Sequence, residues 1–166
     1  LRKEALGAYE ALMESLAGSI EFVATEAIIY VSERLTAPPF DKATEQWRRA
    51  QDMLWTDNPS WSEVGHNLRE AMMSFAGAAV ALTTGQAAEG DPAKTVDRIR
   101  AALARGAAKR SDSLAKSLVA IWGTASDLVQ RLEHGAAKEG EELTFEDARA
   151  AVFAVAFAMS EIARTL

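Results

Sequence analysis

The sequence predicts an all-α fold, a bundle of five or six helices that begins with a long N-terminal helix. Apolar residues recur every three or four positions along nearly every stretch longer than a dozen residues, which is the spacing of amphipathic helices. The breaks between these stretches carry Pro, Gly, Asp and Asn, the residues that end or start helices. No stretch alternates apolar and polar residues as a strand would. At 166 residues, the chain is long enough for a single domain with its own core. Because it lacks an initiator Met, it could also be a piece of a longer protein.

The first helix is predicted from Arg2 to Leu35 and would be about 50 Å long at ~1.5 Å per residue. It ends before Pro38-Pro39, which cannot continue a helix. One apolar face comprises Tyr9, Leu12, Leu16, Ile20, Val23, Ala27 and Tyr30, and a second comprises Leu6, Met13, Ala17, Ala24, Ile28 and Val31. A helix that is apolar on two sides either lies at the centre of a fold or pairs with another chain.

Asp41 is the predicted cap of a short second helix that buries Ala43, Trp47, Ala50 and Leu54 and breaks at Asn58-Pro59. Ser60 and Glu63 have the spacing of a capping box, which predicts the start of a third helix. Its apolar stripe comprises Trp61, Val64, Leu68, Ala71, Phe75, Ala79 and Leu82.

Three further helices complete the predicted bundle. Asp91-Pro92 is typical of a helix start, and this fourth helix is expected to reach Arg110. The fifth follows Ser111-Asp112-Ser113 and is expected to end at His134-Gly135. Thr144 opens the sixth, with Leu143 placed to pack on Ala148. The predicted inward residues are Val96, Ile99, Leu103 and Ala107 in the fourth helix, Leu114, Leu118, Ile121, Ala125, Leu128 and Leu132 in the fifth, and Ala148, Val152, Val155, Met159, Ile162 and Leu166 in the sixth.

Composition excludes several classes of protein. The net charge of −6 argues against non-specific attraction of the whole molecule to nucleic acid. The chain has no cysteine, which excludes disulfides and thiolate metal sites and fits a reducing cytoplasm. The longest nearly unbroken apolar run, Ala150 to Met159, is about half the length of a bilayer span. We therefore expect a cytoplasmic protein without a membrane partner.

The chain has only two histidines, His66 and His134, which limits its catalytic chemistry. Glu63 and His66 have the Glu-x-x-His spacing of carboxylate metal sites in helical bundles, but the second pair that such a site needs is missing. No G-x-S-x-G nucleophile motif occurs. We expect no metal site and no cofactor.

A composite acid–base site is the remaining catalytic interpretation. It would use Arg131 and His134, helped by Arg69 and His66, with arginine stabilising a phosphorane and histidine moving the proton. A structural interpretation of His134 competes with it, because a cation in the last turn of a helix is favoured by the helix dipole.

A basic stripe is predicted on the fourth helix, where Lys94, Arg98, Arg105 and Lys109 share one face. Such a stripe could bind RNA phosphates or an acidic partner. It could also be a solvated face, or pair with the acidic residues that precede the last helix. No aromatic residue interleaves with it, which weakens an interpretation as a single-strand binding surface.

Five large apolar residues, Phe75, Trp122, Phe153, Phe157 and Met159, allow one more alternative. They could line an apolar pocket for a small ligand, or they could form ordinary core.

Two segments of the chain resemble a known family. Asn58-Pro59-Ser60-Trp61, followed by the run from Gly65 to Met72, and the run from Leu143 to Val152 are similar to stretches of HEPN-like helical domains from bacterial conflict and defence systems. Active HEPN ribonucleases carry an Arg, four to six residues, and then a His. Here only two residues separate Arg131 from His134, and Lys138-Glu139-Gly140-Glu141 has no His where similar chains carry one. The resemblance therefore implies dimerisation and binding without the family's ribonuclease site.

Three hypotheses about function follow. The first is a non-catalytic interaction, dimerisation or regulatory module, HEPN-like and bacterial, that forms a homodimer or binds a helical partner. The second is a degenerate ribonuclease or RNA-binding protein of the same fold. The third is a small-ligand-sensing bundle. Whether the chain is an enzyme stays open at this stage, and the missing motif argues against it.

Overall fold

A computed structural model describes residues 22–106, 112–138 and 142–166, and for 135–138 the backbone only. In these ranges the fold is all-helical and without strands, which confirms the predicted helical bundle. A helical segment, 22–34, precedes five further helices. These are α2 (Asp41–Met53), α3 (Trp61–Thr84), α4 (Thr95–Gly106), α5 (Asp112–Lys138) and α6 (Phe145–Thr165). The predicted N-terminal helix is thus confirmed from residue 22 onward, and its earlier part lies outside the described residues. None of the helices in these ranges is long and apolar enough to cross a membrane.

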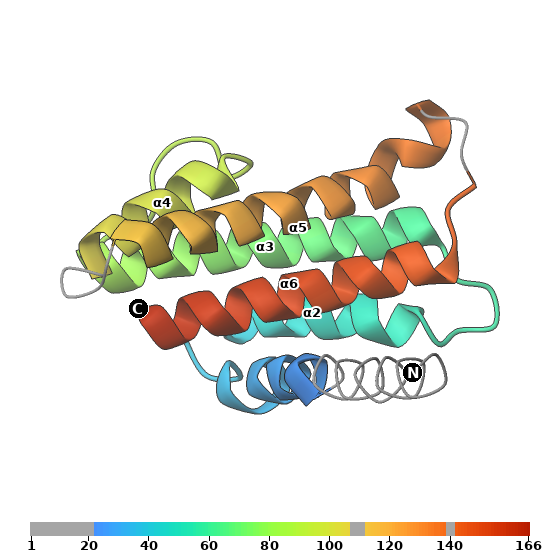
Figure 1. The fold of residues 1–166 in the computed structure, drawn as a ribbon, viewed down its shortest axis with the longest axis horizontal. Helices are drawn as coiled ribbons and strands as arrows, with labels where there is room; N and C mark the ends of the chain where they lie inside the picture. The colour runs from blue at the N-terminus through green and yellow to red at the C-terminus, as the bar shows by residue number, and fades with distance from the viewer. Residues whose placement is uncertain (1–21, 107–111, 139–141) are drawn as a thin grey trace, which may run out of the picture.

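The central element is α3, which packs against α2, α4, α5 and α6 (Figure 1). Its buried face is rich in small residues, so neighbouring helices can approach closely. The buried residues of α3 are Val64, Gly65, Leu68, Ala71, Met72, Phe75, Ala76 and Ala79. The predicted stripe is confirmed except at Leu82, which is 51% exposed. The residues of this stripe are 3.5 positions apart on average, slightly fewer than the residues in one turn of a straight α-helix. The stripe therefore rotates by ~20° per heptad around the helix, and at the last turn of α3 it no longer faces the core.

Aromatic side chains fill the middle of the bundle. The Phe75 ring lies 4.7 Å from that of Phe40 and 5.5 Å from that of Trp122, between centroids. Both buried indoles have a hydrogen-bond acceptor, as buried tryptophans require. Trp122 donates to the Thr95 hydroxyl (3.1 Å), and Trp47 donates to the backbone carbonyl of Val152 in α6 (3.0 Å). Of the residues considered for an apolar ligand pocket, Phe75, Trp122 and Met159 are therefore core, and Phe153 and Phe157 are half-buried.

Three predicted boundaries are wrong by a few residues. Phe40, not Asp41, occupies the cap position of α2, and Asp41 is the first helical residue. The Asp91 carboxylate accepts from the Ala93 N–H (2.9 Å) and closes a turn, so α4 begins at Thr95 rather than at Pro92. Helix α5 continues past Gly135 to Lys138, because two alanines and a lysine, all strong helix formers, follow the glycine.

The predicted inward residues are largely buried. Leu114 is the exception in α5, where it is exposed in the first turn, and Ala107 lies outside the described residues. At the start of α3 the Ser60 hydroxyl oxygen accepts from the Glu63 N–H (3.4 Å), which is one half of the predicted capping box. The return bond from the Ser60 N–H to the Glu63 carboxylate is not present among the described residues.

The start of α6 is a complete capping box. The Asp147 carboxylate accepts from the N–H (2.9 Å) and hydroxyl (2.8 Å) of Thr144, whose hydroxyl oxygen accepts from the Asp147 N–H (3.3 Å). The hydrogen bond from the Thr144 N–H is the main cause that lowers the pKa of Asp147, and the hydrogen bond from the Thr144 hydroxyl is the second. The positive charge of Arg131 lowers this pKa further. Because this pKa is lower in the folded chain than in the unfolded chain, the ionised carboxylate stabilises the fold at pH values above the ordinary pKa of Asp. This stabilisation is lost as the pH falls through the pKa of Asp147 in the folded chain.

The segment 22–34 buries one narrow stripe and exposes apolar side chains on its other side. Ala27, Val31 and Leu35 are buried, whereas Phe22 is 66% exposed and Ile29 is 42% exposed. The buried stripe therefore draws on both predicted apolar faces. Several contacts anchor this region. Arg164 of α6 lies over the Tyr30 ring, the Thr44 hydroxyl donates to the Leu35 carbonyl (2.6 Å), and Arg48 donates to the Ser32 carbonyl.

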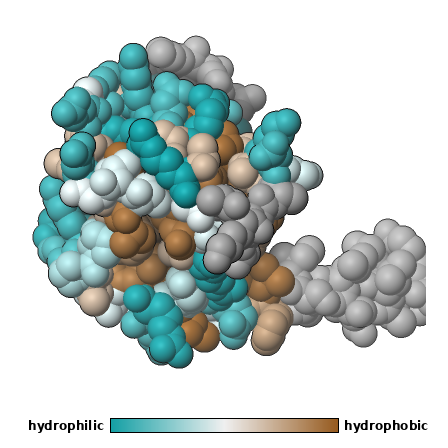
Figure 2. All heavy atoms as spheres, turned by 90° about the vertical axis from the view of Figure 1, so that its left-hand side faces the viewer, coloured by the Kyte–Doolittle hydropathy of each residue, from teal (hydrophilic) through white to brown (hydrophobic). Residues whose placement is uncertain are grey.

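A second hydrophobic area lies at the end of the bundle where α6 finishes. Figure 2 shows it as apolar side chains surrounded by hydrophilic ones. Leu82, near the end of α3, and Leu114, in the first turn of α5, are exposed large apolar side chains.

Helices α3 and α5 approach closely at Gly65. A Cβ atom at this position would lie 2.7 Å from the Glu133 backbone nitrogen and 2.9 Å from the Leu132 Cβ. Both distances are below ordinary van der Waals contact, and one obstacle is backbone, which cannot rotate away. Gly123, in the middle of α5, has nothing within 4 Å of the same atom.

These two glycines give a matched pair of variants. We expect Gly65→Ala to lower the free energy of unfolding by about 1–3 kcal/mol, because α3 and α5 must move apart. Gly123→Ala should leave it unchanged or raise it by up to about 1 kcal/mol, since alanine favours the helix. Urea denaturation of both variants measures this, and equal stabilities would contradict the close approach.

Candidate functional site

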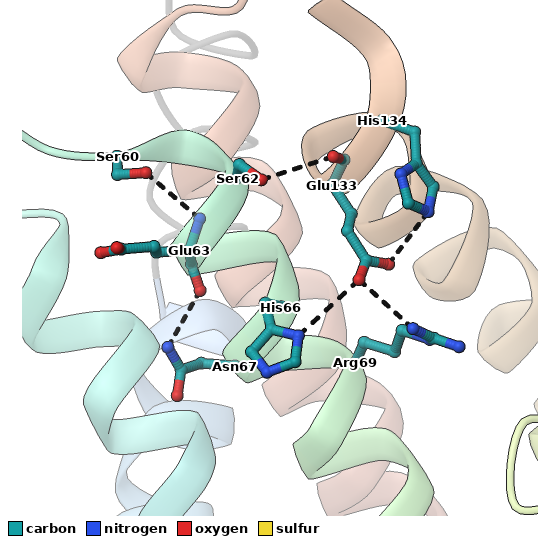
Figure 3. Close-up of polar contacts among 8 residues, drawn as sticks. All are labelled: Ser60, Ser62, Glu63, His66, Asn67, Arg69, Glu133 and His134. Atoms are coloured by element: carbon teal, nitrogen blue, oxygen red, sulfur yellow. Dashed lines mark hydrogen bonds and ion pairs between the residues drawn. The ribbon is translucent and has the colours of Figure 1, made fainter. Parts of the chain in front are cut away.

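Four polar side chains meet where α3 passes α5, and Glu133 is at their centre (Figure 3). Arg69 Nη1 lies 3.3 Å from Glu133 Oε1, and His66 Nδ1 lies 3.7 Å from the same oxygen. His134 Nε2 lies 3.3 Å from Glu133 Oε2. One carboxylate therefore faces a guanidinium and two imidazoles, and we call these four residues the Glu133 cluster.

Burial differs sharply within the cluster. The Glu133 side chain is 11% exposed, whereas those of His66 and His134 are 60% and 58% exposed. The carboxylate thus lies at the base of the cluster, and the two imidazoles reach the solvent from it. Arg69 donates a hydrogen bond to Glu133 Oε1 (3.3 Å), whereas the buried Oε2 has no hydrogen-bond partner among the described residues. Each imidazole turns one ring nitrogen toward the carboxylate. The other nitrogen of each ring is left to act on a ligand.

The local fold explains why these residues meet. His66 directly follows Gly65, and Arg69 lies three positions further, on the same side of α3. Because Gly65 lets the α5 backbone approach, both side chains reach Glu133. The Ser62 hydroxyl, one turn earlier, donates to the Glu133 backbone carbonyl (3.5 Å).

The structure brings together three of the four predicted site residues, His66, Arg69 and His134. The guanidinium of Arg131, the fourth, faces the Asp147 carboxylate (4.0 Å) at the start of α6. Sequence reasoning missed Glu133 as the residue that joins the cluster. The available signal was its position next to His134, with Gly65 and His66 adjacent in another helix.

Two hollows flank the cluster, and both are lined by Glu133 and His134. The smaller, about 150 Å³, lies between α3 and α5, and Arg69, Met73 and Gln130 are among the residues that line it. The larger, about 520 Å³, is lined by Trp61 and Leu143 among others. A chain-like ligand that crosses the cluster would therefore find space on either side of it.

The predicted basic stripe is partly used inside the molecule. Arg98 donates to the backbone carbonyls of Glu89 (3.2 Å) and Gly90 (3.0 Å) and so holds the loop before α4. Lys94 and Arg105 are exposed, and Lys109 lies outside the described residues. Binding of an anionic partner by this stripe stays a prediction.

The part of the chain that the structure describes contains no group of three or more His, Cys, Asp or Glu side chains placed to hold a metal ion. Glu63, the partner of His66 in the Glu-x-x-His spacing, directs its carboxylate away from His66 (Figure 3).

Comparisons with protein-family models, curated proteins and solved structures found no match to the chain.

Proposed function

We propose that the chain cleaves RNA by metal-independent acid–base chemistry at the Glu133 cluster. The observation that carries this proposal is the convergence of both histidines and Arg69 on one buried carboxylate. Two imidazoles beside an arginine are the groups needed to move two protons and to stabilise a charged phosphorane.

The reaction uses the 2′-hydroxyl of the substrate as its nucleophile. One imidazole, neutral at the start, takes the proton of this hydroxyl while the 2′-oxygen forms a bond to phosphorus. The bond from phosphorus to the 5′-oxygen breaks, and the other imidazole, protonated at the start, donates its proton to that oxygen. The products are a 2′,3′-cyclic phosphate and a 5′-hydroxyl end.

Each member of the Glu133 cluster has a distinct role in this proposal. The Arg69 side chain is 42% exposed, so it can turn part of its guanidinium toward phosphate oxygens. Glu133 orients the imidazoles and does not contact the substrate. The proposal differs from the HEPN motif, in which Arg and His lie close in sequence, because here Arg69 and His134 come from two helices.

The first test is cleavage of a fluorescent single-stranded RNA in the presence of EDTA. We expect 2′,3′-cyclic phosphate ends by mass spectrometry and a bell-shaped pH dependence, because one imidazole must be neutral and the other charged. His66→Ala and His134→Ala should each lower the rate by about 10²–10⁴-fold. Arg69→Ala should also slow it, and the control Arg149→Ala, an exposed arginine of α6, should not.

Three results would contradict the proposal. They are intact RNA, full activity in both histidine variants, or cleavage of a strand that carries 2′-deoxynucleotides throughout. The last would exclude the 2′-hydroxyl as the nucleophile.

A second candidate function is the non-catalytic, HEPN-like interaction module, acting as a homodimer. It is supported by the exposed apolar side of segment 22–34. Phe22, Val23 and Ala27 line a groove of about 330 Å³ against Phe157 of α6. Exposed aromatic and branched side chains gathered on one side favour a partner surface. The apolar stripe of α6 is buried in the core, which leaves segment 22–34 as the surface to test.

Molecular mass in solution tests this second candidate. If segment 22–34 joins two copies, the wild type is a dimer by light scattering, and Ile29→Glu is a folded monomer because a charge replaces an apolar contact. The control Ala120→Glu places the same charge at an exposed position of α5 and should stay dimeric. A wild type that is monomeric at all concentrations would exclude the homodimer.

A further inference from the structure

We propose that the smaller hollow beside the Glu133 cluster is a subsite for a pyrimidine base of the RNA. The inference deepens the proposed function and rests on it, because the phosphate attached to this nucleoside would be the one held at the cluster.

The position of the hollow links it to the reacting groups. Glu133, His134 and Arg69 form one end of it, and the loop before α4 forms the other through Ala93 and Thr95. A phosphate that contacts Arg69 and His134 would therefore have its nucleoside directly beside this space. The base can enter the hollow without any opening of the helices.

The size of the hollow selects the base. Its volume is about 150 Å³. A protein cavity of about 150 Å³ holds benzene, a single six-membered ring. One pyrimidine ring fits within its walls, whereas the second ring of a purine would have to extend through the open side of the hollow. The larger hollow on the other side of His134, about 520 Å³, has no such limit. Trp61 is part of its wall and offers a face on which any base can stack.

The lining of the smaller hollow suits a flat, polar-edged ring. Met72 and Met73 supply thioether side chains, which make favourable contacts with aromatic rings. Ser126 and Gln130 line it from α5, and a hydroxyl and an amide each both donate and accept hydrogen bonds. They can therefore match the carbonyl and amine edges of cytosine or uracil. Thr95 contributes only to the wall of the hollow, because its hydroxyl already accepts a hydrogen bond from the indole N–H of Trp122.

The test measures binding separately from cleavage. The four nucleosides, each as the 3′- and the 5′-monophosphate, are titrated into the intact chain by calorimetry. We expect the cytidine and uridine compounds to bind at least about tenfold more tightly than the purine compounds, since misfit in a shaped pocket is worth about 10–200-fold. RNA cleavage should show the same preference next to the scissile bond.

Ala93→Leu is the decisive variant, because Ala93 is exposed in a turn and its replacement adds bulk to the hollow without disturbing the core. It should abolish the pyrimidine preference, whereas Ala104→Leu, on the exposed side of α4, should keep it. Equal binding of all four bases, or an unchanged preference in Ala93→Leu, would overturn the subsite.

The subsite and the proposed function fail in different ways. Pyrimidine-selective binding that Ala93→Leu removes supports the subsite even if RNA stays intact, and only the proposed catalysis then fails. If cleavage depends on both histidines but is equally fast next to every base, the subsite is overturned. The proposed catalysis is then still supported.

Discussion

The missing side chain of Gly65 is the constraint on which the candidate site depends. The α5 backbone occupies the space where a Cβ atom of residue 65 would lie, 2.7 Å from the Glu133 nitrogen. Any other residue there would push α3 and α5 apart by a large part of an ångström or more. His66 Nδ1 is already 3.7 Å from Glu133 Oε1, so a small separation would end this contact. The helix packing and the site are therefore set by the same residue.

The Glu133 carboxylate makes the cluster more than a surface ion pair. Exposed pairs such as Arg149 with Glu146 stabilise a fold by about 0–1 kcal/mol. A carboxylate that is mostly buried loses hydration and needs compensating partners. Arg69 provides such a partner through its hydrogen bond to Oε1, and the two imidazoles lie against the same carboxylate, whose Oε2 has no hydrogen-bond partner among the described residues. Two imidazoles and a guanidinium thus lie at one place on an acidic protein, where a phosphate could bind.

The helices and their buried stripes could be predicted from the sequence, because the 3.6-residue period depends only on residues that are close together in the chain. The start of the last helix at Thr144 is likewise a local signal, and the structure confirms it, with Asp147 completing a capping box that was not predicted. Asp91 shows the limit of local signals, because its carboxylate can cap a helix or close a turn, and it closes a turn. Glu133 could not be assigned from sequence, because its contacts depend on the register of α5 against α3. That register is a property of packing between residues almost seventy positions apart.

Glu133 brings both histidines together at the Gly65 contact. The chain contains only two histidines, so long-range ¹⁵N–¹H spectra of the imidazoles measure it directly. We expect Glu133→Gln to shift the signals of both rings, because both lose a neighbouring negative charge. Gly65→Ala should shift both as well, whereas Glu63→Gln, whose carboxylate points away from the cluster, should shift neither. If Glu133→Gln leaves either imidazole unchanged, the Glu133 cluster does not exist in solution as described.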